Sequence, residues 1–166
     1  MKNALLGKFT TPFETAPFEE IKVEHYLPAL KTAIETAKAE IDVIIADSEK
    51  ANFLNTIAAI DFSGEEVGRT AEIFFNLNSA ETNDEIQALA REMSPLLTEY
   101  GNDILLNEAL FARIEKVWQN RASENLDGEQ TMLLEKTYKA FVRTGARLNA
   151  EQKLALREID QKLSTP

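Results

Sequence analysis

Apolar residues recur at alternating spacings of three and four over most of this chain, and this period restricts the fold more than any other feature. The first stripe consists of Leu27, Leu30, Ile34, Ala37, Ile41 and Ile44. These side chains share one face of a helix, and Lys31 and Glu35 lie on the other face. The pattern predicts a long amphipathic helix, with Pro28 in its first turn, where a missing N–H costs little.

A second stripe keeps the same period across the sequence DFSGEE. It consists of Ile57, Ile60, Gly64, Val67, Ala71, Phe74 and Asn78. Since the phase is unbroken, we predict one long helix with a kink near Ser63–Gly64 rather than two helices. We expect the pair Phe74 and Phe75 to lie in the core. The polar sequence FFNLNSAETND then predicts a connection between helices. We expect Asn76, Asn78 and Ser79 to be turn residues of this connection rather than a binding site.

A third helix is predicted to begin at the sequence TNDE, which fits a capping box. In that motif the Thr82 side chain accepts from the backbone amide of Glu85, and the Glu85 carboxylate accepts from the amide of Thr82. The stripe behind the cap consists of Ile86, Leu89, Met93, Leu96 and Tyr100. Pro95 lies inside this helix and has no backbone donor, so we expect a kink there.

Three further helices are each preceded by a residue that favours the N-cap position, namely Asn107, Asp127 and Asn149. Gln130 and Gln152 follow the last two at the capping-box spacing, and Gly145 suits a helix end. The sequence therefore predicts an all-α fold of about six helices in antiparallel pairs. We expect an irregular, extended lead-in over residues 1–22 and a single helical domain over residues 23–166.

Composition narrows the class of protein and of partner. The 166 residues carry a net charge of −10, and residues 51–100 hold nine acidic but only two basic residues, which disfavours binding to nucleic acid. The chain contains no cysteine, so disulfides and thiolate metal sites are excluded. The apolar run Ala4–Leu6 is too short for a signal peptide, and no window is apolar enough to span a membrane. We expect a cytoplasmic protein.

Motifs that carry chemistry are scarce. The only histidine is His25, so the two histidines of an H-E-x-x-H zinc site are excluded within this chain. No G-x-S-x-G or phosphate-binding glycine loop occurs. Adjacent carboxylates such as Glu65 and Glu66 point about 100° apart on a helix and do not converge as an acid–base pair. We expect His25 to pack or cap rather than to catalyse.

Five long segments, taken in order, resemble one family of enzymes. They are PFETAPFEEIKVEHYLPALKTAI, NFLNTIAAIDFSGE, IFFNLNSAETNDEIQALAREMSPLL, ILLNEALFARIEKVW and LLEKTYKAFVRTGARL. Together they cover nearly the whole chain. They resemble the N-terminal region of the zinc metallopeptidases that comprise peptidyl-dipeptidase, oligopeptidase A and thimet oligopeptidase, and the first two are the most similar.

This resemblance implies a neurolysin-like, all-helical enzyme that cuts short peptides in a deep channel. Its zinc is held by H-E-x-x-H and a further glutamate toward the C-terminus, and no position here matches them. We therefore expect a segment that walls the channel, with no catalytic, cofactor-binding or metal-binding residue, and with a C-terminal catalytic domain as its partner. The alternative is a free-standing helical interaction module. A reading frame that continues past Pro166 into an H-E-x-x-H sequence would favour the enzyme segment. A native stop codon after Pro166 would favour the free-standing module.

Overall fold

The computed structural model describes residues 3–164, so residues 1–2 of the expected lead-in and 165–166 of the expected domain lie outside the described part. Within it the chain forms helices and turns but no strand, which confirms the all-α prediction. The helices are α1 (Val23–Ala46), α2 (Ala59–Phe62), α3 (Glu65–Ala80), α4 (Asp84–Leu105), α5 (Glu108–Asn120), α6 (Gly128–Thr144) and α7 (Ala150–Ser164). Shorter turns are the 3-10 turns Pro12–Glu14 and Arg121–Ser123, and the π-helical turn Phe53–Ala58, which runs directly into α2.

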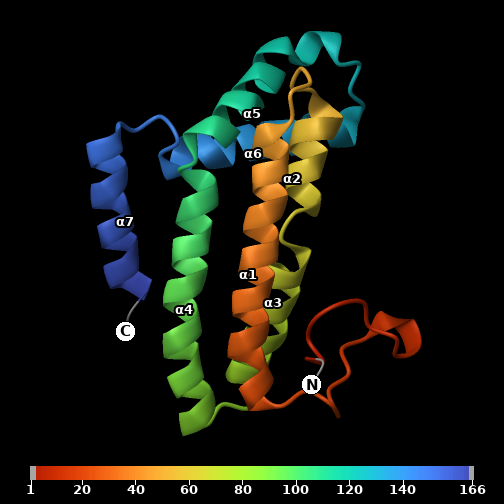
Figure 1. Ribbon diagram of the computed structural model, residues 1–166, viewed down its shortest axis with the longest axis vertical. Coiled ribbons are helices and arrows are strands. Elements are labelled where there is room, and N and C mark those ends of the chain that lie inside the picture. Colours follow the sequence, from red (N-terminus) through yellow and green to blue (C-terminus); the bar gives the residue numbers. More distant parts are fainter. Residues whose placement is uncertain (1–2, 165–166) are drawn as a thin grey trace.

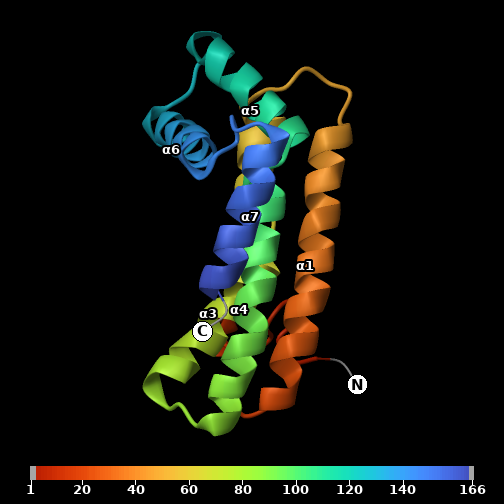
Figure 2. The same ribbon diagram turned by 90° about the vertical axis from the view of Figure 1, so that its left-hand side faces the viewer.

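The long helices stand side by side as columns (Figure 1). Helix α1 runs in one direction, α2 and α3 return beside it, α4 runs parallel to α1, and α7 descends along α4 on the side away from α1. Helices α5 and α6 cross one end of these columns, as the turned view also shows (Figure 2). Residues 3–22 wrap around the other end, beside α1 and α3.

Two apolar clusters form the core. One lies under α5 and α6, and its fully buried members include Ile57, Leu110, Ile114, Val117 and Leu134. The other joins α1, α3 and α4 to the lead-in, and its fully buried members include Leu5, Tyr26, Leu30, Phe74 and Met93. Phe75 packs against this second cluster, so the core assignment of the phenylalanine pair is confirmed.

Several predicted helix ends are confirmed by hydrogen bonds. The Asn107 side chain accepts from the amide of Leu110 at 2.9 Å. Asp127 with Gln130, and Asn149 with Gln152, each form a reciprocal capping box. Gly145 adopts the left-handed conformation, with φ at 109°, and ends α6. The next amide, that of Ala146, donates to the Phe141 carbonyl, which satisfies one of the last carbonyls of the helix.

The single long helix predicted over the second stripe is wrong, because the chain breaks completely at Ser63–Gly64. Gly64 has φ at 71°, a conformation that cannot continue a right-handed helix. Its amide donates to the Glu40 carboxylate on α1 at 2.9 Å. The break therefore lies where the kink was expected, but it separates α2 from α3.

The predicted connection and capping box around residues 76–85 are also wrong in detail. Helix α3 continues to Ala80 and includes all three predicted turn residues, Asn76, Asn78 and Ser79. Burial of Phe74 in the core holds this turn helical despite its polar residues. The N-cap of α4 is Asn83, whose side chain accepts from the amide of Ile86 at 2.9 Å. The Thr82 hydroxyl instead donates to the side chain of Asn78.

Two prolines lie inside helices rather than at their ends. Pro28 is the sixth residue of α1 rather than part of its first turn, because the helix already begins at Val23. The carbonyl that loses its partner belongs to the exposed Glu24, where water can replace the bond. Pro95 lies inside α4 as predicted. The bend that we expect at Pro95 stays a prediction.

Candidate functional site

His25 serves as a helix cap. Its ring nitrogen Nδ1 accepts a hydrogen bond from the amide of Lys22 at 3.2 Å, at the residue that precedes α1. Its backbone carbonyl accepts from the Asn3 side chain at 2.7 Å, which ties the lead-in to the same helix end. The half-buried ring is thus occupied by a structural contact, as expected from the sequence.

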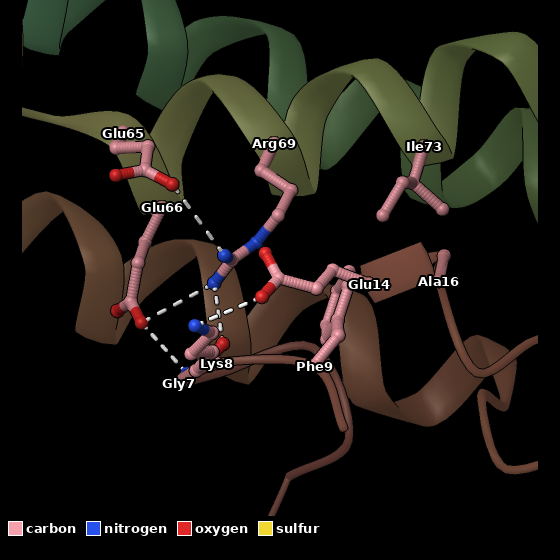
Figure 3. Close-up of a pocket in the computed structure, with 9 residues that line it drawn as sticks. All are labelled: Gly7, Lys8, Phe9, Glu14, Ala16, Glu65, Glu66, Arg69 and Ile73. Atoms are coloured by element: carbon pink, nitrogen blue, oxygen red, sulfur yellow. Dashed lines mark hydrogen bonds and ion pairs between the residues drawn. The ribbon is translucent and has the colours of Figure 1, made fainter. Parts of the chain in front are cut away.

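A polar hollow of about 690 Å³ lies between the lead-in and the first turns of α3 (Figure 3). Its centre is Arg69, which points from α3 toward the lead-in. The guanidinium donates to the Gly7 carbonyl at 2.8 Å and lies 4.6 Å from the centre of the Phe9 ring. The Glu66 carboxylate accepts from the Gly7 amide at 2.7 Å and from Arg69 at 3.3 Å.

The charged side chains of the hollow pair with one another. Lys8 pairs with Glu14 at 2.8 Å within the lead-in, and Arg69 lies between Glu65 and Glu66. The cluster is therefore suited to fastening the lead-in onto α3 by the hydrogen bonds of Arg69 and Glu66 to the Gly7 backbone and by the contact of Arg69 with the Phe9 ring. It offers neither a nucleophile beside a base nor a free carboxylate pair.

A second hollow of about 510 Å³ lies where α1, α4, α5 and α7 meet, and Asp103 is its central charge. The Asp103 carboxylate contacts Lys38 of α1 at 2.6 Å and Arg157 of α7 at 2.7 Å. Burial alone would raise the pKa of Asp103, but hydrogen bonds from Lys38 and Arg157 outweigh it and hold this pKa below its ordinary value. The carboxylate stays charged and bridges three helices.

Two further cations are almost fully buried, and the sequence analysis missed both. Arg113 of α5 donates to the carbonyl of Asp47 at 2.6 Å and to its carboxylate at 3.2 Å, just past the end of α1. Lys153 of α7 donates to Glu108 at 3.1 Å. A signal was present, because Arg113 falls next to Ile114 on the apolar stripe of its helix. A charged residue in a stripe position indicates a buried ion pair or a capped helix end.

Among residues 3–164, no three His, Cys, Asp or Glu side chains gather so as to hold a metal ion. None of the helices in this part of the chain is both long and apolar enough to cross a bilayer.

Comparison with known proteins gives clear relatives. The chain is 38% identical over 163 residues, 98% of its length, to the dipeptidyl carboxypeptidase of Escherichia coli, and 37% identical to that of Salmonella typhimurium. It is 25% identical over 164 residues to the oligopeptidase A of Salmonella typhimurium. The chain spans about a quarter of the length of each of these relatives. No protein-family model matches it.

Proposed function

Since this chain is homologous over almost its whole length to about a quarter of peptidases of the dipeptidyl carboxypeptidase and oligopeptidase A family, we propose that it is the N-terminal helical segment of such an enzyme. The parent is a zinc metallopeptidase that hydrolyses short peptides in a deep channel in the cytoplasm. Its catalytic domain lies C-terminal to this segment and carries the zinc ligands. The observation that carries the proposal is the 38% identity over 163 residues.

In this proposal the segment helps to wall the channel and contributes no catalytic, substrate-binding or metal-binding residue. Support comes from the way its charged groups are used. Arg69, Asp103 and Arg113 each bind groups on other elements of the segment itself. A wall needs rigid helices with matched contacts, and the side-by-side helices with their ion-paired junctions support this role.

Assays on the isolated chain test whether it has peptidase activity or binds zinc. We expect no turnover of an internally quenched fluorescent peptide and no stoichiometric zinc by elemental analysis, because a catalytic zinc requires about three protein ligands. The dipeptidyl carboxypeptidase of Escherichia coli, assayed in parallel, is the positive control. Chelator-sensitive turnover that follows the chain through several purification steps would contradict the proposal.

A further inference from the structure

A shallow groove runs between α1 and the α2–α3 break. It consists of two adjoining hollows, of about 300 and 320 Å³, that share Glu40 and Phe62. The buried side chains of Ala33 and Ala37 line one hollow, and Ile44 lines the other. We call this surface the α1–α2 groove. It lies between the columns of α1 and α2–α3, whereas α7 lies on the far side of α4 (Figure 1).

Two large apolar side chains border this groove and remain uncovered. Phe62 is 78% exposed and Val43 is 72% exposed. Leaving such groups in water is unfavourable relative to burying them. Apolar side chains that gather at a groove, with polar residues at the rim, mark an interaction surface.

The backbone holds the groove in this shape. Phe62 is the last residue of α2, and the left-handed Gly64 turns the chain immediately after it. The Gly64 amide is fixed to Glu40 across the groove, and the Tyr100 hydroxyl lies so close beneath Gly64 that a Cβ there would approach it to 2.5 Å. The exposure of Phe62 therefore follows from the backbone conformation at the α2–α3 break.

We propose that the α1–α2 groove is the docking site for a helix from the remaining three quarters of the peptidase. This inference rests on the proposed function. The relatives carry about three quarters of their length outside the matched segment, so a large partner surface is available in one chain.

The rim indicates the chemistry of the docking helix. Glu40 lines both hollows, and the exposed Asp61 belongs to α2, which borders the groove. The lining residues of the two hollows include no lysine or arginine. A helix with apolar residues at i, i+3 and i+4 and a flanking Lys or Arg would complement this surface.

The absence of cysteine makes the groove easy to probe. The experiment compares two proteins that both carry Val43→Cys. The first is the isolated chain. The second is a chimera in which this variant chain replaces the aligned 163 residues of the Escherichia coli dipeptidyl carboxypeptidase. Both are labelled with a maleimide, and peptide mapping by mass spectrometry reports the rate at that site. Each rate is normalised to the same protein unfolded in urea. We expect labelling at least about tenfold slower in the chimera than in the isolated chain.

A matched variant, Met132→Cys, lies on α6 at a half-exposed position outside the groove. We expect similar labelling rates at this site in both proteins. Equal rates for Val43→Cys in the isolated chain and in an active chimera would overturn the groove assignment while leaving the proposed function intact. Equal protection at both sites would also overturn it, because the shielding would not belong to the groove.

Other occupants give other results. Protection that appears only when a peptide substrate is added would assign the groove to substrate, and protection that depends on the concentration of the isolated chain would assign it to a second copy. Either result overturns the proposal. If the chimera fails to fold, the chain is labelled in the presence of the remaining three quarters of the Escherichia coli enzyme as a separate polypeptide, and unchanged labelling there also overturns it.

Discussion

Asp103 lies in a polar stretch of α4 and connects three helices. Its carboxylate joins Lys38 of α1 to Arg157 of α7, and Arg157 also donates to the neighbouring Asn102 carbonyl at 3.1 Å. Helix α7 packs mainly on α4, so this junction and the buried Lys153 fix its position. The last helix is thus held largely by ion pairs, although its sequence shows an apolar stripe.

Replacing Asp103 with asparagine should therefore reduce stability in a pH-dependent way. The pKa of Asp103 is lowered in the folded chain, so its stabilisation is present above the unfolded pKa of about 3.9. It is lost as the pH falls through the lower, folded pKa. We expect Asp103→Asn to cost about 1 kcal/mol at pH 7, because these bonds are charged but partly exposed.

The measurement is urea unfolding of both proteins at pH 7 and at an acid pH below the unfolded pKa of an aspartate. The difference between variant and wild type should be smaller at the lower pH. Glu158→Gln, at an exposed site on α7, is the control and should stay within about 0.5 kcal/mol of wild type. A pH-independent cost for Asp103→Asn would mean that the lost contact is steric rather than electrostatic.

Among the elements, the sequence predicted best those features that depend on neighbouring residues. The capping residues Asn107 and Asp127 were found because a cap needs partners only three residues away. The break before α3 was underestimated because its cause is distant: Glu40 binds the Gly64 amide from another helix. The Arg69 cluster was missed for the same reason, since 62 residues separate Arg69 from the Gly7 carbonyl. A period of apolar residues does not encode such contacts.

Substitutions at two neighbouring glycines distinguish a position that requires a left-handed backbone, Gly64, from an ordinary helical position, Gly68. Gly64→Ala should destabilise the chain by at least about 1 kcal/mol, because an L-residue is strained at positive φ and the new Cβ would meet the Tyr100 hydroxyl. Gly68→Ala is the matched control: its site in α3 has no heavy atom within 4 Å of the added Cβ. It should stabilise the chain by about 0.5–1 kcal/mol. Thermal or urea unfolding measures both, and equal effects of the two substitutions would contradict the break at Gly64.

For the whole molecule, the distribution of exposed apolar residues matters most. Besides the α1–α2 groove, the outer side of α7 exposes Ile159 and Leu163, the latter by 79%. The isolated chain therefore presents apolar surface at α7 as well as at the groove. The net charge of −10 opposes contact between copies at low ionic strength.

We expect the isolated chain to self-associate increasingly as salt screens this repulsion. Light scattering at high protein concentration should show a rising mean mass with added salt. Ile159→Lys should weaken the effect, whereas Met132→Lys on α6 should not. Such a dimer would replace missing contacts of the parent enzyme. A strictly monomeric chain at high salt would instead favour the free-standing interaction module.

If these 166 residues form a non-catalytic wall of a peptidase, they should be exchangeable with the aligned segment of a relative. The most direct measurement is the peptidase activity of the chimera in which this chain replaces the aligned 163 residues of the Escherichia coli dipeptidyl carboxypeptidase. We predict turnover of a quenched fluorescent peptide within about tenfold of the parent, a change of about 1.4 kcal/mol in the activation barrier. We also predict that a chelator abolishes it. A chimera that folds, as judged by circular dichroism and cooperative unfolding, yet shows no turnover would contradict the claim.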